Sequence, residues 1–393
     1  MTRKARVIAF YLPQYHPIPE NDKFWGKGFT EWNNVVKAKP LFRGHVQPRI
    51  PADLGFYDLR LPEIREQQAA LAREAGIEGF CYWHYWLGGG KELLERPFNE
   101  VVDSGKPDFP FCLGWANHTW STRTWNSQKA RDDSEVIAEQ TYPGEADYVA
   151  HFNKYLKAFQ DRRYIKVDGK LLFVVFAPRD FADFRAFKDC WNRLAGEHGL
   201  GGFFFVGITT NFSITSKTET GEKKIDFRIK SKADMERIAG DYYQDIRDRG
   251  YDGVNPRGDI RANVLSESFL SYYFKRFLQR IGIRTVVKHD YRDIVEHYYC
   301  SRDTDPDVYP TIIPNFDRSP RAGWRTNHLW YNATPELFKK QVLKAIDLVR
   351  DKDDEHKLLF LKSWNEWGEG NYMEPDIKYG HAFLDALKNE LCI

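Results

Sequence analysis

The segment LLFLKSWNEWGEG (358–370) joins an apolar run to a group of polar and acidic residues. Leu358–Trp364 is short and rich in large apolar residues, which is typical of a buried strand. Glu366 and Glu369 follow it three positions apart, and the glycines at 368 and 370 allow a tight turn. The segment therefore predicts a strand that ends in a turn with two carboxylates.

Comparable apolar runs recur along the chain, at Val7–Tyr11, Gly79–Trp83, Phe109–Trp115, Leu171–Phe176, Phe203–Ile208, Gly250–Val254 and Thr311–Pro314. Segments with a helical period separate many of them, at Pro62–Ala75, Leu93–Val102, Tyr148–Phe159, Phe181–Ala195 and Pro335–Val349, and a last helix is expected at about 380–391. Strands that alternate with helices predict βαβ units and a parallel sheet. Roughly eight strands favour an α/β fold with a closed (β/α)8 barrel of the TIM type.

The 393 residues fit one such barrel with loop insertions, so we expect a single catalytic domain over residues 1–393. The most polar stretch, at about 213–234, is interpreted as an exposed insertion after the fifth strand. Residues 261–288 are expected to be helical and partly buried. The sequence contains no low-complexity linker and no internal repeat.

The overall charge is nearly balanced, with 58 basic and 56 acidic side chains. This balance argues against nucleic acid or an anionic membrane as the main partner. The five cysteines are far apart and form no CxxC pair, which is typical of free thiols in a reducing compartment. We find no signal-peptide pattern and no apolar stretch long enough for a membrane span, and therefore expect a cytoplasmic protein.

Aromatic residues make up 16% of the chain, and many follow the predicted strands beside polar groups. Examples are CYWHYW (81–86) and WNEW (364–367). Functional residues of a TIM barrel lie at the carboxyl ends of its strands. Rings beside hydrogen-bonding groups suit sugars, because a sugar has apolar C–H faces and polar hydroxyls. The composition by itself is only a hint of such a ligand.

Glu366 and Glu369 form the sharpest candidate site. Two carboxylates held close together can divide the work of glycosidic chemistry, with one as acid and the other as base or nucleophile. Their proximity separates their pKa values, and the flanking Trp364 and Trp367 would add to the separation by desolvation. The alternative is a surface loop with two solvated glutamates.

Other patterns carry less weight. We find no HExxH or Cys/His grouping for a metal, and no phosphate loop or dinucleotide fingerprint, so no cofactor is expected. Arg257-Gly-Asp259 is interpreted as a chance occurrence. His84 follows a strand among rings, where a lone histidine is more often a hydrogen-bonded core residue than a ligand.

Five motifs together resemble WbsX-type polysaccharide-biosynthesis proteins, which are classed as glycosyltransferases and are similar to glycoside hydrolase family 99. They are FYLPQYHPIPENDKFWGKGFTEW (10–32), GFCYWHYW (79–86), LGWANHTW (113–120), IIPNFDRSPR (312–321) and SWNEWGEGNYMEPD (363–376). They extend over nearly the whole chain and occur in the same order as in the family.

The resemblance implies a (β/α)8 barrel that acts on α-linked sugars, mannose-like ones in the hydrolase family. It also implies that Glu366 acts as base on the sugar 2-hydroxyl, which attacks C1 through a 1,2-anhydro intermediate with net retention. Glu369 would protonate the leaving group and then activate the acceptor. The polar insertion at 213–234 has no counterpart that we can place in the family pattern.

The sequence therefore predicts a retaining glycosyltransferase of surface-polysaccharide (O-antigen or capsule) biosynthesis. A retaining, endo-acting α-glycoside hydrolase of the endo-α-mannosidase kind is the first alternative, and a non-catalytic sugar-binding barrel is the second. The expected partner is an oligosaccharide or polysaccharide. If a nucleotide-sugar donor is used, Arg318 and Arg321 are candidates to bind its phosphates. The residues expected to contact substrate are Tyr11, Trp32, Tyr82, His84, Trp115, Asn117, Asp317, Trp367 and Glu374.

Overall fold

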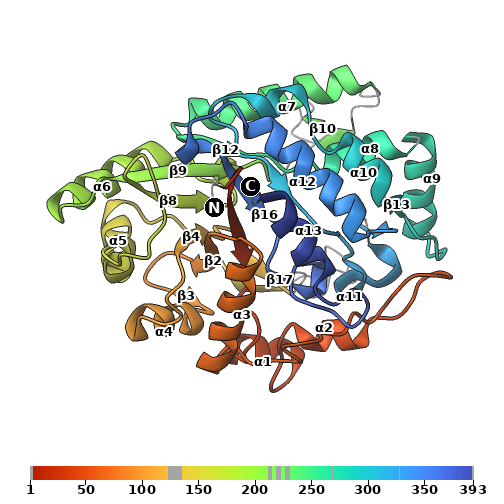
Figure 1. The fold of residues 1–393 in the computed structure, drawn as a ribbon, viewed down its shortest axis with the longest axis horizontal. Coiled ribbons are helices and arrows are strands. Elements are labelled where there is room, and N and C mark those ends of the chain that lie inside the picture. The colour runs from red at the N-terminus through yellow and green to blue at the C-terminus, as the bar shows by residue number, and fades with distance from the viewer. Residues whose placement is uncertain are drawn as a thin grey trace.

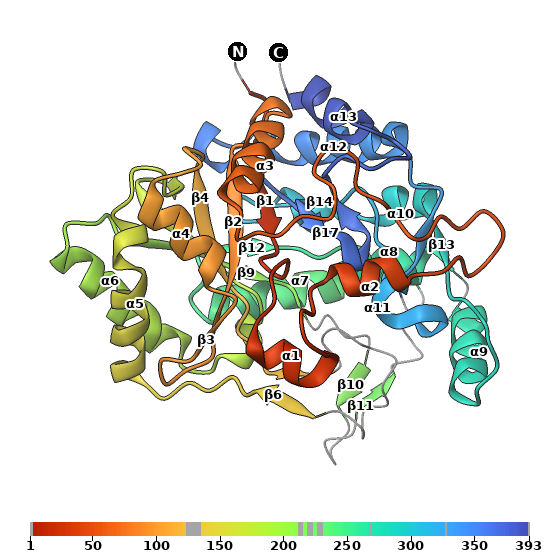
Figure 2. The same cartoon turned by 90° about the horizontal axis from the view of Figure 1, so that it is seen from below.

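A parallel barrel forms the centre of the computed structural model, and helices surround it (Figures 1 and 2). The structure describes residues 3–122, 135–210, 215–217, 223–225, 231–267, 269–326 and 328–391. Within these ranges the barrel strands are β1 (Arg6–Tyr11), β2 (Gly79–Trp86), β4 (Phe111–Trp115), β8 (Lys170–Val175), β9 (Phe203–Ile208), β12 (Gly253–Asn255), β14 (Thr311–Ile312) and β16 (Leu358–Leu361). The predicted TIM-type barrel is confirmed.

The strands follow the order β12-β9-β8-β4-β2-β1-β16-β14, and every neighbouring pair in this order is parallel. An isolated parallel bridge between Val254 and Val308 spans the seam between β12 and β14. Asn255 Nδ2 adds hydrogen bonds to Tyr309 O at 2.7 Å and Thr311 Oγ1 at 2.9 Å. The barrel is thus nearly closed, which leaves few unpaired backbone groups at a sheet edge.

Alternate residues of each strand face the barrel interior and the helices, because side chains alternate along a strand. In β1 and β2, Phe10 stacks on Trp83 inside the barrel, with ring centroids 4.7 Å apart. Their neighbours Tyr11 and Tyr82 pack outside, and the Tyr11 hydroxyl donates to Gln68 of α3. Both sides of the strands are buried, which explains why their sequences are almost continuously apolar.

The helices that the structure describes are α1 (Pro19–Trp25), α2 (Trp32–Lys37), α3 (Pro62–Glu74), α4 (Arg96–Ser104), α5 (Glu145–Phe159), α6 (Phe184–Glu197), α7 (Lys232–Asp248), α8 (Asp259–Ser266), α9 (Phe269–Arg280), α10 (Tyr291–His297), α11 (Ser319–Ala322), α12 (Pro335–Val349) and α13 (Ala382–Leu391). α3 and α12 begin with proline, and the Thr334 side chain caps α12 by accepting from the Leu337 N–H. α7 and α10 were not expected from the sequence.

Short strands lie outside the barrel, at β3 (Glu92–Leu93), β5 (Trp120–Ser121), β6 (Val136–Ala138), β7 (Lys166–Val167), β10 (Thr215–Lys217), β11 (Lys223–Ile225), β13 (His289–Asp290), β15 (Trp330–Tyr331), β17 (Asn365–Glu366) and β18 (Asn371–Tyr372). β10 and β11 pair antiparallel within the predicted insertion at about 213–234. The other residues of the insertion up to 230 lie outside the described residues. Its last residues, from Ser231 to Asp234, form a capping box at the start of α7.

The cysteines at 81, 112, 190 and 300 are buried free thiols, and Cys392 lies outside the described residues. In the part of the chain that the structure describes, no helix is both long enough and apolar enough to span a bilayer.

Close packing between strands predicts that alanine substitutions at two glycines, one in a strand and one in a helix, have opposite effects on stability. A Cβ at Gly79 of β2 would lie 2.3 Å from the Pro110 carbonyl oxygen, whereas a Cβ at Gly196 of α6 meets no atom within 4 Å. We expect Gly79→Ala to lower the free energy of unfolding by about 1–3 kcal/mol. Gly196→Ala should raise it by about 0.5–1 kcal/mol, because alanine favours a helix. Urea denaturation measures both, and equal effects would contradict the packing.

Candidate active site

A pocket of about 810 Å³ opens at the carboxyl ends of the barrel strands. One part of its wall is aromatic and comes mainly from the first half of the barrel: Phe10, Trp83, Tyr85 and Phe176. The other part is charged and comes from the second half: Arg257, Asp259, Arg318, Arg321, Lys362, Glu366 and Glu369. The pocket therefore offers an apolar side and an ionic side to one ligand.

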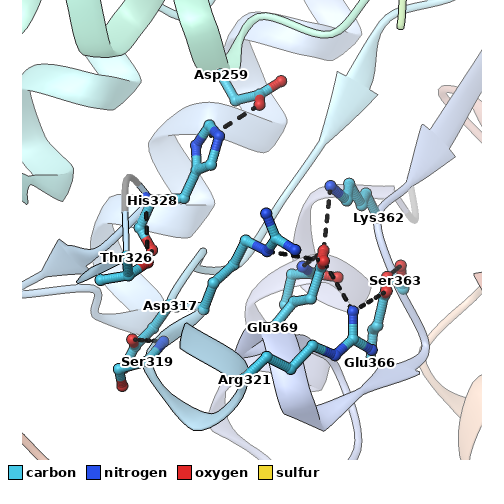
Figure 3. Close-up of polar contacts among 12 residues, drawn as sticks. Asp259, Asp317, Ser319, Arg321, Thr326, His328, Lys362, Ser363, Glu366 and Glu369 are labelled. Atoms are coloured by element: carbon cyan, nitrogen blue, oxygen red, sulfur yellow. Dashed lines mark hydrogen bonds and ion pairs between the residues drawn. The ribbon is translucent and has the colours of Figure 1, made fainter. Parts of the chain in front are cut away.

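Glu366 and Glu369 lie together on the charged wall (Figure 3). Glu366 ends β17, and Glu369 ends the short 3₁₀ helix η5 (Trp367–Glu369). The Ser363 hydroxyl donates to Glu366 Oε2 at 3.2 Å, and the Glu369 carbonyl accepts from the Asp317 N–H at 2.7 Å. The alternative of a solvated surface loop does not apply, because these carboxylates are largely buried.

Arg321 links the two glutamates to a third carboxylate. Its Nη1 lies 2.8 Å from Glu369 Oε1 and 3.5 Å from Glu366 Oε1, and its Nε donates to Glu31 Oε1 at 2.8 Å. Arg321 and Glu31 are almost completely buried. A Cβ at Gly368 would lie 1.5 Å from Glu31 Oε1, so only glycine allows this approach. Glu31 begins α2 and reaches the turn from the other end of the chain.

Several cations surround the Glu369 carboxylate. Besides Arg321, Arg318 Nε lies 3.0 Å from Oε1 and Lys362 Nζ lies 3.7 Å from Oε2. Burial alone would raise the pKa of Glu369, but these cations outweigh it and hold the pKa well below its usual range. Glu369 is therefore ionised at neutral pH.

Glu366 has the opposite tendency. Burial raises the pKa of its carboxyl, and the neighbouring Glu369 charge adds to the rise, against the opposing effect of Arg321. The cations around Glu369 lower its pKa, while desolvation and the Glu369 charge raise that of Glu366, so the two pKa values move apart. The sequence predicted a separation for a close pair. The resemblance implies that Glu369 is the acid, which would require the higher pKa of the pair. In the structure Glu369 instead has the lower pKa.

The Arg257-Gly-Asp259 segment also lies in this pocket. Arg257 Nη2 pairs with Asp259 Oδ2 at 2.9 Å, and this cation helps to hold the pKa of Asp259 at about 2 against burial. His328 Nδ1 lies 3.9 Å from Asp259 Oδ2, and burial lowers the pKa of His328 to about 3. The charges of Arg257 and Asp259 thus belong to the pocket wall, a role that the sequence analysis did not assign to them.

Among the described residues, no three His, Cys, Asp or Glu side chains are grouped as metal ligands. Cations lie between the carboxylates of this pocket instead, at Arg321, Arg318 and Lys362. The ionic side thus presents cations and carboxylates together, already paired with one another, to a ligand.

Four of the predicted substrate contacts face away from the pocket, and the structure places them in the layer between strands and helices. Tyr11 and Tyr82 pack on each other, His84 Nε2 lies 2.9 Å from His151 Nε2, and Trp115 Nε1 donates to Trp86 O at 2.8 Å. Burial lowers the pKa of His84 to about 3, so its ring is neutral. Side chains alternate along a strand, so the residues next to these four point the other way and line the pocket, as Phe10, Trp83, Tyr85 and Ala116 do.

The remaining predicted contacts are also outside the lining of this pocket. Asn117 joins two strand ends through two hydrogen bonds with the Ala177 backbone. Asn117 Nδ2 donates to Ala177 O at 3.0 Å, and the Ala177 N–H donates to Asn117 Oδ1 at 2.8 Å. Trp32 packs on Trp367, whose Nε1 donates to Glu374 Oε2 at 2.6 Å. Burial raises the pKa of Glu374 to about 7. Trp32, Trp367 and Glu374 thus pack against the turn that carries the glutamate pair, on the side away from the pocket.

Asp317 lies beside the site rather than in it. Its carboxylate accepts from Gln47 Nε2 at 2.6 Å and pairs with His45 Nε2 at 2.9 Å. Burial would raise the pKa of Asp317, but His45 and the hydrogen bonds to its carboxylate hold it below its usual value. The residue fixes the loop that precedes Arg318 and Arg321.

Comparisons with known proteins agree with this architecture. The profile of the family described as "Glycosyltransferase WbsX" matches residues 7–387. The chain belongs to the WbsX glycosyltransferase family. Two relatives, both named WxcX and from strains of Xanthomonas campestris pv. campestris, are 30% identical over 99% of the chain. The chain spans about half the length of these curated relatives.

Solved structures share the fold. A protein titled "Glycoside hydrolase-like protein" has a TM-score of 0.57 and 14% identity, and covers 99% of this chain and 94% of its own. The GH99 endo-alpha-mannosidase from Bacteroides thetaiotaomicron, solved with BIS-TRIS-propane, has a TM-score of 0.50 and 12% identity, with 96% and 88% coverage. At such identities the likeness shows the barrel fold of this WbsX family member and nothing about its substrate.

The buried ion pair predicts an effect of Glu31 on stability. We expect Glu31→Gln to lower the free energy of unfolding by about 1–3 kcal/mol, because the Arg321 guanidinium stays buried with less compensating charge. The matched control is Glu296→Gln, which breaks an exposed pair with Lys344 and should change stability by less than about 1 kcal/mol. Urea denaturation measures both variants. A Glu31 variant as stable as its control would argue against a stabilising role for the buried pair of Glu31 with Arg321.

Proposed function

We propose that this WbsX family member is a retaining glycosyltransferase whose sugar donor is activated by a phosphate or diphosphate group. The observation that carries the proposal is the group of cations around Glu369, formed by Arg318, Arg321 and Lys362. Membership of a family described as glycosyltransferases supports a carbohydrate as the substrate class.

The leaving group decides between transfer from such a donor and hydrolysis of a glycan. A glycan oxygen needs a proton from a general acid as its bond to C1 breaks. Glu369, the residue that the resemblance implies as acid, is held ionised by its neighbours and is a poor proton donor. A phosphate leaves without a proton and instead requires positive charge, which Arg318 and Lys362 can supply. The charged wall thus favours a phosphate leaving group.

The bond changes follow from these protonation states together with the mechanism that the resemblance implies. The Glu366 carboxylate accepts the proton of the donor 2-hydroxyl, O2 attacks C1, and the C1–O bond to phosphate breaks with its electrons on the phosphate. An acceptor hydroxyl then attacks C1, and the C1–O2 bond breaks. The proton on Glu366 returns to O2, and the acceptor proton passes to the phosphate released in the first displacement, because the low pKa of Glu369 makes that carboxylate a weak base. Two displacements at C1 give net retention.

The aromatic wall suits the sugar. Trp83 and Phe176 are only partly buried, and their rings meet edge to face at 5.6 Å on the side of the pocket formed by the first strands. A sugar can stack its C–H face there while its anomeric oxygen points to the cations. Trp83 and Tyr85 therefore replace Tyr82 and His84 as the proposed contacts from β2.

We also propose that the product belongs to a surface polysaccharide such as O-antigen or capsule, which rests on the resemblance to polysaccharide-biosynthesis proteins. The cytoplasmic location expected from the sequence stays a prediction. An endo-acting hydrolase and a non-catalytic sugar-binding barrel are the outcomes that the experiments below can return instead.

The pH profile distinguishes transfer from hydrolysis. A base must lose its proton to act, so kcat/KM should fall as pH decreases through the raised pKa of Glu366. No falling limb should follow toward pH 8, because the free enzyme needs no protonated group: the proton that Glu366 later returns comes from the donor itself. Product analysis with nucleotide-sugar donors and α-linked oligosaccharides at each pH provides the measurement.

Glu366→Gln should reduce kcat by roughly a hundredfold or more and leave donor binding intact. A bell-shaped profile with release of reducing ends would establish a hydrolase. Binding without turnover in every variant would establish a sugar-binding barrel.

A second prediction concerns the phosphate. We expect Arg318→Gln to raise the donor KM by about ten- to a hundredfold, since it removes a charge-assisted contact with the phosphate. Arg302→Gln is the matched control, because Arg302 is half-exposed, pairs with Asp305 and lies outside the pocket. Steady-state kinetics with donor as the varied substrate measures both. An unchanged donor KM would contradict the proposal that the donor phosphate binds at this charged wall.

A further inference from the structure

α9 and the turn after it carry an exposed apolar stripe. Phe274, Phe277 and Ile281 follow one another at helical spacing and are 62%, 58% and 56% exposed. Ile283, in the segment that follows, is 48% exposed. Three large side chains on one helix face are unlike scattered surface leucines, because together they form a patch that water solvates poorly.

The opposite face of α9 fastens the helix to the protein. Gln279 is buried, and its Nε2 donates to Thr285 O at 2.8 Å and Trp324 O at 3.0 Å. Near the start of the helix, Ser271 donates to Glu267 Oε1 at 2.8 Å. Gln279 and Ser271 thus make polar contacts with the protein, whereas Phe274 and Phe277 of the same helix are exposed. Figure 2 shows α9 at the periphery of the molecule.

The charge of this segment is as unusual as its exposure. Residues 269–288 contain no aspartate or glutamate, and their basic residues are Lys275, Arg276, Arg280, Arg284 and Lys288. The whole chain carries a formal net charge of only +2. Arg280 and Arg284 are exposed and flank the apolar stripe.

We propose that α9 docks the protein on an anionic membrane surface, with the stripe of Phe274, Phe277 and Ile281 in the lipid interface and the side chains of Arg280 and Arg284 at the headgroup phosphates. Apolar side chains on one face and flanking basic side chains are the features of helices that lie in the interface plane. Basic residues near an anionic surface add to the affinity without inserting. The helix would lie on the membrane and not cross it.

The charge pattern favours a membrane over a protein partner. A protein surface usually presents both signs of charge, and the core of a protein interface is depleted in charged residues. Here one sign of charge accompanies the apolar stripe over twenty positions. Such a segment complements a surface that is negative throughout.

The position of α9 connects this surface to the pocket. α9 follows α8, whose Asp259 and Ile260 line the pocket, and it contacts η3 (Gly323–Arg325), which follows Arg321. Docking would therefore hold the rim of the charged wall near the lipid headgroups. An acceptor sugar carried on a membrane lipid could enter there. This consequence rests on the proposed function, whereas the docking itself does not.

Flotation with lipid vesicles tests the docking without donor or acceptor. We expect the protein to float with vesicles of phosphatidylcholine and phosphatidylglycerol and not with phosphatidylcholine alone, and added salt should weaken the binding. Phe274→Ser, Phe277→Ser and Ile281→Ser combined should lower the partition coefficient by roughly a hundredfold. Arg280→Ser with Arg284→Ser should lower it by about twenty- to thirtyfold, since each basic residue contributes about fivefold.

Leu343→Ser with Ile377→Ser is the matched control, because it removes apolar side chains that are 42% and 70% exposed elsewhere on the surface. These control changes should leave flotation unchanged, and thermal unfolding checks that all variants stay folded. Absence of binding to anionic vesicles, or an equal loss in the control, would overturn the proposal. So would sedimentation that shows self-association through this face in place of vesicle binding. Transferase assays on the same variants with a soluble acceptor keep a failure of docking separate from a failure of the proposed function.

Discussion

The burial of Arg321 among three carboxylates is the constraint on which the site depends. A guanidinium out of water is stable only if ionised partners compensate it, and Glu31, Glu366 and Glu369 do so from different parts of the chain. Glu31 comes from the first barrel loop, Arg321 from the seventh and the pair from the eighth. Arg321 and its three carboxylates therefore tie together the two ends of the sequence, beside the pairing of the first strand, β1, with the last barrel strand, β16. The requirement for glycine at 368 follows from the same contact, because a side chain there would displace Glu31.

The same group of charges also decides the protonation of the pair. Arg321 lies nearer to Glu369 than to Glu366, and Arg318 and Lys362 add charge on the same carboxylate. Glu369 is stabilised as an anion, while Glu366 is left with desolvation and a like-charged neighbour. Two glutamates three residues apart thus acquire different chemistry from their surroundings alone. A wall with this charge is poorly suited to donate a proton and well suited to stabilise a departing phosphate.

The barrel and its glutamate pair could be predicted because both depend on local pattern. Apolar runs of strand length, separated by helical periods, gave the order of the eight strands, and the turn at Gly368 and Gly370 marked the eighth strand end. The predicted contacts on β2 had a different outcome, because a one-residue change of parity moves a side chain from the barrel interior to the helix layer. His84 faces the helices, and its neighbours Trp83 and Tyr85 face the pocket. Arg257 and Asp259 were missed although they follow the sixth strand directly, since their role depends on charges that the fold brings from elsewhere.

The nearly neutral composition conceals a separation of charge that only the fold makes visible. The sequence average argued against an anionic membrane as main partner, yet the segment 269–288, which comprises α9 and the residues after it, contains basic residues and no acidic ones. Glu267, just before the segment, pairs with Lys275, whereas Arg280 and Arg284 are exposed. The same half of the barrel supplies the cations of the pocket wall, at Arg257, Arg318 and Lys362. An average over 393 residues cannot register either cluster, because electrostatic attraction acts over about 10 Å at moderate salt and depends on local density. If a sugar phosphate binds as proposed, the aromatic side chains on one side of the pocket and the cations on the other would favour one orientation, with the anomeric carbon toward Glu366.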